Sequence, residues 1–168
     1  GGVSSIEHGT LMDESVFPLM KQYGTYLVPT IIAGKSAADS AKIPGYYPPM
    51  VAKKALEIGP RIQNTFSKAY KAGVKIAFGT DAGVYAHGTN WKEFVYMTEA
   101  GMPFLEAIQS ATWNAADLMG TQAILGSIEK NKLADIIAVE GDPTKNVYQM
   151  GKVNFVMKDG VVYKNTLK

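Results

Sequence analysis

The feature that most constrains the fold of this chain is a short apolar run followed by a turn that carries a single acid. Residues 74–78 are typical of a short buried strand, and a turn of small residues that carries Asp81 follows directly. Strand-like and helix-like segments alternate before it, which is the pattern of parallel βα units with right-handed crossovers. In such an α/β protein, a carboxylate at the carboxyl end of a strand lies where active sites form. We therefore expect Asp81 to belong to a functional site.

The remaining segments predict a series of short strands and amphipathic helices. Hydrophobic spacing and breaker residues indicate two further early strands, at 4–7 and 26–32, and helices at 13–23, from about 50 to 72 with a bend at Gly59-Pro60, at 91–100 and at 103–118. Residues 33–48 predict a loop. The last segment predicts a strand at 134–139 and a hairpin of 153–158 with 161–163, joined by Asp159-Gly160.

Composition narrows the classes of partner and site. The 168 residues are 46% hydrophobic and 19% charged, which is ordinary for a folded domain. The 17 basic and 15 acidic residues are mixed along the chain, so we expect no nucleic-acid partner. Cysteine is absent, which excludes disulfides, zinc–thiolate sites and a Cys nucleophile. No apolar run approaches the roughly 20 residues of a membrane span, so no membrane partner is expected.

The first five residues have no signal-peptide layout and read as the lead-in to a strand, as if the chain starts within a fold. We expect a cytoplasmic location, and an upstream signal peptide stays open as the alternative.

Two histidines are the other main candidates for chemistry. His8 directly follows a predicted strand, and imidazole is a favoured ligand of zinc-type metals; a strand-end His bonded to a loop is the alternative. His87 lies shortly after Asp81 and suits substrate binding or proton exchange, although an exposed His without function fits equally. Tyr85 and Asn90 are weaker candidates of the same kind. Asp81 itself could instead cap a turn.

Motifs for other chemistries are missing from the sequence. It contains no Gly-x-Ser-x-Gly elbow, no phosphate-binding P-loop and no Gly-x-Gly-x-x-Gly fingerprint. Serine-hydrolase, nucleotide-phosphate and dinucleotide functions are therefore not supported.

Four fragments in chain order resemble one known family. They are Ser-Ile-Glu-His-Gly-Thr at 5–10, Val-Pro-Thr at 28–30, Phe-Gly-Thr-Asp-Ala-Gly at 78–83 and the stretch 132–143. Together they resemble the last part of a metal-dependent amidohydrolase, closest to the Xaa-Pro dipeptidase (prolidase-like) and carboxypeptidase branch, which is similar also to imidazolonepropionase-type enzymes. The resemblance implies strands six to eight of a TIM-type (β/α)8 barrel in residues 1–120. Residues 121–168 would contribute strands to a small β-sandwich.

The same resemblance implies roles for the candidate residues. His8 would end strand six as a metal ligand, and Asp81 would end strand eight as both metal ligand and catalytic proton carrier. His87, Tyr85 and Asn90 would contact the substrate. The implied cofactor is a divalent metal, Zn by expectation, as one or two ions in the complete enzyme. The implied reaction is hydrolysis of an amide or peptide bond through a metal-bound hydroxide.

Several of the family's metal ligands have no counterpart in this sequence. Its two His residues form no His-x-His pair, and no carboxylated Lys can be assigned. Because a hydrolytic zinc site needs about three protein ligands, we expect this chain alone to be inactive. The expected partners are a small peptide or amide substrate, the missing N-terminal part of the barrel or another chain, and further copies in a homo-oligomer. A cyclic-amide hydrolase or deaminase, or a catalytically silent fragment or assembly module, stays open as an alternative.

Overall fold

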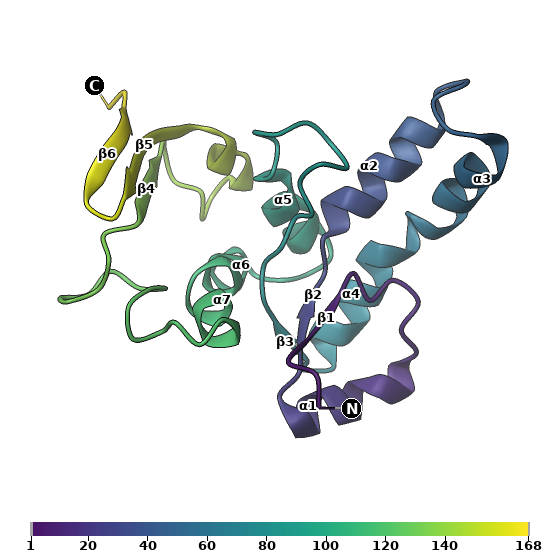
Figure 1. The fold of residues 1–168 in the computed structure, drawn as a ribbon, viewed down its shortest axis with the longest axis horizontal. Helices are drawn as coiled ribbons and strands as arrows, with labels where there is room; N and C mark the ends of the chain where they lie inside the picture. Colours follow the sequence, from purple (N-terminus) through teal and green to yellow (C-terminus); the bar gives the residue numbers. More distant parts are fainter. Residues whose placement is uncertain (1, 168) are drawn as a thin grey trace.

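The chain forms two three-stranded sheets with helices around and between them, as Figure 1 shows. The computed structural model describes residues 2–167. The first sheet is parallel, with its strands in the order β1 (Ser5–Glu7), β2 (Tyr26–Val28) and β3 (Lys75–Ile76). The second is antiparallel, with its strands in the order β4 (Ile136–Val139), β5 (Val153–Lys158) and β6 (Val161–Asn165).

Helices follow every strand of the parallel sheet. After β1 come η1 (Glu14–Val16) and α1 (Phe17–Tyr23). Three helices lie between β2 and β3, namely α2 (Ile31–Ala41), α3 (Pro49–Ile58) and α4 (Arg61–Lys71). Those after β3 are α5 (Lys92–Glu99), α6 (Phe104–Ala111) and α7 (Trp113–Leu118), with η2 (Val147–Gly151) between β4 and β5. This order confirms the predicted α/β class. No helix within residues 2–167 is both long and apolar enough to cross a membrane.

Both faces of the parallel sheet carry buried side chains, and β2 is buried along its whole length. Leu27 and Ile76 point into a core that the helices complete with side chains such as Phe66 and Met97. Tyr26 and Val28 of β2, together with Ala77 directly after β3, pack on the opposite side. Successive strand residues point to opposite faces, and parallel sheets are usually covered on both. The ends of these strands are therefore held from two sides.

Helix α2 contradicts the sequence prediction. The prediction of one strand over 26–32 and a loop over 33–48 is wrong, because β2 ends at Val28 and residues 31–41 are helical. Pro29 has no N–H to continue the ladder, and Thr30 takes a left-handed conformation with φ 48°. The Thr30 side chain makes no capping hydrogen bond, so no local signal marks the start of this helix.

Two helices predicted as continuous are each divided. The break between α3 and α4 falls at Gly59-Pro60, where the sequence predicts a bend. The break between α6 and α7 falls at Thr112, whose φ of −125° and ψ of −89° leave the helical region, so one helix over 103–118 is wrong. The hairpin prediction is confirmed, since Asp159 and Gly160 have φ of 51° and 77°, the positive values that a tight turn between twisted strands requires.

Candidate functional site

Three residues with positive φ follow the three parallel strands at one edge of the sheet. His8 follows β1, Thr30 comes two residues after β2, and Asp81 lies in the turn after β3, with φ of 63°, 48° and 51°. Such values are uncommon outside glycine and are true outliers for a β-branched residue such as Thr. Each costs on the order of 1–3 kcal/mol and persists only where the surroundings impose it, most often at functional sites. This edge is therefore the candidate site.

Backbone contacts bring the three strand ends together. The N–H of His8 donates to the Val28 carbonyl at 2.9 Å, and that of Ala77 donates to the Leu27 carbonyl at 3.0 Å. A Cβ on Gly79 would lie 2.3 Å from Cγ1 of Val28, so glycine alone allows the chain after β3 to pass this close to β2. The turn that carries Asp81 is thereby held beside His8.

The structure brings together the two residues predicted as metal ligands. Nε2 of His8 lies 4.0 Å from Oδ2 of Asp81, and the two side chains are 50% and 48% exposed. Imidazole nitrogen and carboxylate oxygen are both donors that zinc-type metals accept. Within residues 2–167, no group of three or more His, Asp or Glu side chains could hold a metal. The pair therefore fits part of a metal site and lacks the remaining ligands.

The three residues predicted to bind substrate lie in the loop after Asp81 in different settings. Asn90 Nδ2 donates to Thr80 Oγ1 at 3.0 Å, next to Asp81 in the chain. Burial raises the pKa of Tyr85, the Thr80 hydroxyl partly offsets this, and the carboxylates of Glu93 and then Asp81 add to it. The Tyr85 hydroxyl is buried and makes no hydrogen bond of normal geometry with the described residues. His87 is exposed, and no polar contact joins it to the other candidates within the described chain.

Glu93 is a buried charged residue that the sequence analysis missed. It lies on α5 with 0% exposure, and its Oε1 and Oε2 accept from the N–H groups of Ile31 at 2.8 Å and Ile32 at 2.7 Å. Burial raises the pKa of Glu93 to about 7, although the two N–H groups act to lower it. The available sequence signal is its position four residues before Met97, on the buried face of the helix.

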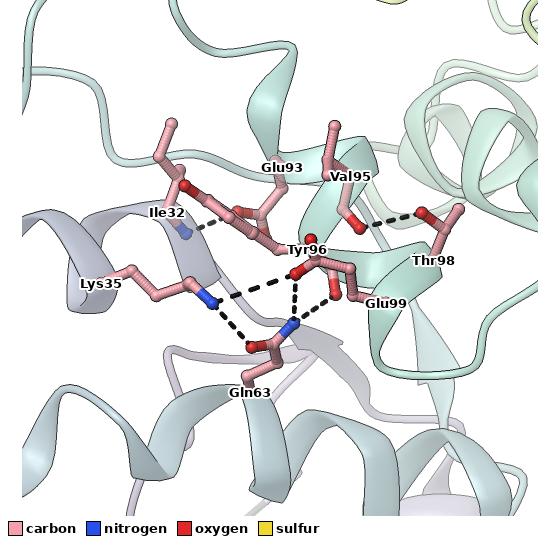
Figure 2. Close-up of polar contacts among 8 residues, drawn as sticks. All are labelled: Ile32, Lys35, Gln63, Glu93, Val95, Tyr96, Thr98 and Glu99. Atoms are coloured by element: carbon pink, nitrogen blue, oxygen red, sulfur yellow. Dashed lines mark hydrogen bonds and ion pairs between the residues drawn. The ribbon is translucent and has the colours of Figure 1, made fainter. Parts of the chain in front are cut away.

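Further polar contacts tie α5 to α4 and α2, as Figure 2 shows. Gln63 Nε2 donates to the Tyr96 carbonyl at 2.8 Å, and Gln63 Oε1 accepts from Lys35 Nζ at 2.9 Å. The Glu99 carboxylate lies 3.3 Å from Gln63 Nε2 and 4.0 Å from Lys35 Nζ. These contacts hold α5 in place, and with it the carboxylate of Glu93 at the start of α2.

Comparison with known proteins identifies the family. The model of the amidohydrolase family matches residues 1–164, and the chain belongs to that family. This confirms the resemblance seen in the sequence. Members of the family typically depend on divalent metals.

Individual relatives match nearly the whole chain. The crystal structure of a Xaa-Pro dipeptidase with bound methionine in the active site is 55% identical with a TM-score of 0.95, covering 98% of this chain and 40% of that one. A prolidase complexed with N-methylphosphonate-L-proline is 30% identical with a TM-score of 0.87, covering 98% and 41%. Ochratoxinase of Aspergillus niger is 35% identical, covering 97% of this chain and 34% of its own length. The chain thus spans well under half the length of these relatives.

Proposed function

We propose that this chain supplies part of the active site of a metal-dependent hydrolase of amide bonds, a prolidase-like dipeptidase or carboxypeptidase. The observation that carries the proposal is the approach of His8 Nε2 to Asp81 Oδ2 at 4.0 Å, with both strained residues at the carboxyl edge of one parallel sheet. The similarity to a Xaa-Pro dipeptidase and a prolidase supports a peptide substrate. β1 to β3 then correspond to barrel strands six to eight.

Each side chain has a defined part in this proposal. His8 Nε2 and Asp81 Oδ2 would each ligate a divalent metal, with His8 on the second ion where two are bound, and the metal would supply a Lewis acid that lowers the pKa of water. The other oxygen of the Asp81 carboxylate, Oδ1, would accept the proton of the attacking water and return it to the leaving amine nitrogen. Asn90, Tyr85 and His87 contact the substrate from the following loop.

The remaining ligands come from outside this chain. In the parallel sheet β1 and β3 are the outer strands, and in the second sheet β4 and β6 are. Unpaired strand edges present free N–H and C=O groups to any further strand. At β3 the Ile76 carbonyl already accepts from Asn114 Nδ2 and the Phe78 N–H donates to the Ser110 carbonyl, each at 2.9 Å, so β1, β4 and β6 offer the edges for further pairing. We propose that an N-terminal part of the same barrel, or another chain, pairs there and completes the site. The protein that carries all of these parts is called the complete protein below.

A deaminase of the same superfamily is the second candidate. The 5-methylthioadenosine/S-adenosylhomocysteine deaminase of Thermoanaerobacter pseudethanolicus is 28% identical over 142 residues, covering 73% of this chain. A deaminase releases ammonia, whereas a dipeptidase releases two amino acids, so the products separate the two candidates.

The test is metal analysis of the complete protein together with an assay on a panel of Xaa-Pro dipeptides. We expect stoichiometric divalent metal and dipeptide hydrolysis, both lost in His8→Ala. Glu7→Gln, at the exposed preceding position, is the matched control and should keep both. Ammonia release without peptide cleavage would favour the deaminase. A protein with neither metal nor turnover would contradict the proposal and favour a catalytically silent module.

A further inference from the structure

We propose that Thr30 is a positioning residue that fixes the tautomer and orientation of the His8 ring, and that Glu93 holds Thr30 in the conformation this requires. The inference rests on the proposed role of His8 as a metal ligand. It concerns residues that carry no metal themselves.

The two contacts of the Thr30 hydroxyl determine which ring nitrogen of His8 carries the hydrogen. Oγ1 of Thr30 lies 2.8 Å from the Pro29 carbonyl oxygen, which can only accept, and we assign the single hydroxyl proton to this contact. The same Oγ1 lies 2.5 Å from Nδ1 of His8. Since its proton is already used, Oγ1 can only accept from the ring, and Nδ1 carries the hydrogen. The lone pair of neutral His8 is then on Nε2, the atom that faces Asp81.

The contact with His8 requires Thr30 to adopt an energetically unfavourable backbone conformation. The residue is 4% exposed and has φ 48° and ψ 45°. This conformation is unfavourable for a β-branched side chain, whose χ1 is also restricted. The hydroxyl is therefore aimed by a strained, buried turn. A strained turn of this kind is retained only if neighbouring groups impose it.

Thr30 occupies the N-cap position of α2 without acting as a cap. A Thr at this position ordinarily accepts a hydrogen bond from the N–H of the second or third helical residue. Here no side-chain cap is made, because the hydroxyl contacts Pro29 and His8 instead. The first N–H groups of the helix would be left without partners in a buried position.

Glu93 resolves this conflict. Its two carboxylate oxygens accept from Ile31 and Ile32, the two residues that directly follow Thr30. The cap is thus supplied by a side chain 62 positions further along the chain, and the Thr30 hydroxyl is released for His8. Figure 2 shows Glu93 reaching Ile32 from α5, beside the Gln63 contacts that fix this helix.

Substitutions at Thr30 separate the role of the hydroxyl from that of side-chain shape. Thr30→Val keeps the β-branched shape and removes the hydroxyl, whereas Thr30→Ser keeps the hydroxyl. Thr98→Val is the matched control, because among residues 2–167 the Thr98 hydroxyl bonds only within its own helix, to the Val95 carbonyl at 2.8 Å. Thr30→Ala, which also lacks the hydroxyl and is less strained with positive φ, replaces Thr30→Val if the latter does not fold.

The readout is the Zn²⁺ dissociation constant of the complete protein, measured by competition with a chromogenic chelator. Loss of a hydrogen bond to a ligating His costs on the order of 10–100-fold in metal affinity, which is the loss we expect for Thr30→Val, while Thr30→Ser should stay within roughly twofold of wild type. Thr98→Val should bind as wild type does.

The outcomes distinguish this inference from the proposed function. Wild-type affinity in Thr30→Val, with His8→Ala still impaired, would overturn the role of Thr30 and leave the metal site standing. A loss in Thr30→Ser as large as in Thr30→Val would also overturn it, because the hydroxyl would then not matter. No Zn²⁺ binding by wild type, or unimpaired binding by His8→Ala, would overturn both.

Discussion

The two sheets of this chain differ in how far their side chains are exposed to solvent. β2 of the parallel sheet is buried along its whole length, whereas β6 of the second sheet is exposed along its whole length. Large apolar side chains such as Ile137 and Tyr163 lie on the surface of the second sheet. A cavity of about 590 Å³ also separates this sheet from α6 and α7. The buried sheet holds its strand ends rigidly, which a site requires, while the exposed sheet offers surface for further chain to cover.

Two aspartates make the comparison sharper, because Asp81 and Asp159 have the same φ of 51°. Asp159 belongs to a hairpin turn, next to Gly160, and its exposed side chain has no ion pair or hydrogen bond within the described residues. Asp81 has the same backbone conformation, but its carboxylate faces His8. The same positive φ therefore reverses the chain at Asp159 in the second sheet and places Asp81 in the candidate site after the first.

The largest expected effect is that of Asp81→Asn on turnover. The amide cannot carry the proton, so kcat of the complete protein on its best Xaa-Pro dipeptide should fall by about 10²–10⁴-fold. Asp159→Asn is the control, and it should leave kcat unchanged because Asn-Gly forms the same turn. Wild-type turnover in both variants would make Asp81 a turn residue of the same kind as Asp159.

The next largest expected effect is on stability, and it depends on how deeply the substituted isoleucine is buried. Ile76 and Ile137 are each the second residue of a strand, but they are 3% and 55% exposed. Ile76→Ala should lower the free energy of unfolding by about 2–5 kcal/mol, whereas Ile137→Ala should change it by less than about 0.5 kcal/mol wherever the second sheet stays uncovered, and by more where further chain packs on it. Urea denaturation of the complete protein measures both. Equal costs would mean that another segment covers Ile137 in solution.

Glu93→Gln should have the smallest effect, and one that depends on pH. Near pH 5 Glu93 is a neutral acid whose hydroxyl oxygen can still accept from the second N–H group, whereas the NH2 of Gln cannot, so the free energy of unfolding should fall by about 1–3 kcal/mol. Because the pKa of Glu93 is raised from 4.5 to about 7, the folded state holds the proton more tightly than the unfolded state. The stabilisation that this bound proton gives the folded state is complete below about pH 4.5 and is lost as the pH rises through about 7. The difference in free energy of unfolding between wild type and Glu93→Gln should therefore narrow toward about pH 8.

The control for this prediction is Glu57→Gln on α3, where the carboxylate is 60% exposed and pairs with Arg61 at 3.3 Å, so that the substitution should change stability by less than about 0.5 kcal/mol. A difference between wild type and Glu93→Gln that widens from about pH 5 to about pH 8 would contradict the raised pKa.

Much of the fold could be predicted because its signals are local. The apolar segments of β1 and β3, the stop at Gly24 and the Asp159-Gly160 turn depend on residues adjacent in the chain. The positions of His8 and Asp81 directly after strands follow from the same local patterns. Their spatial proximity follows from the rule that parallel strands share a carboxyl edge.

By itself the sequence determined the succession of parallel strands along the chain, the hairpin and the placement of His8 and Asp81 after strands, and it carried the resemblance to the family. Only the tertiary structure decided that α2 begins at Ile31, that Thr30 contacts His8, and that Glu93 is buried. The physical reason is that the cap of α2 is a carboxylate 62 positions away. A contact of that kind leaves no pattern in the residues beside the helix, because it exists only once α5 has packed against α2.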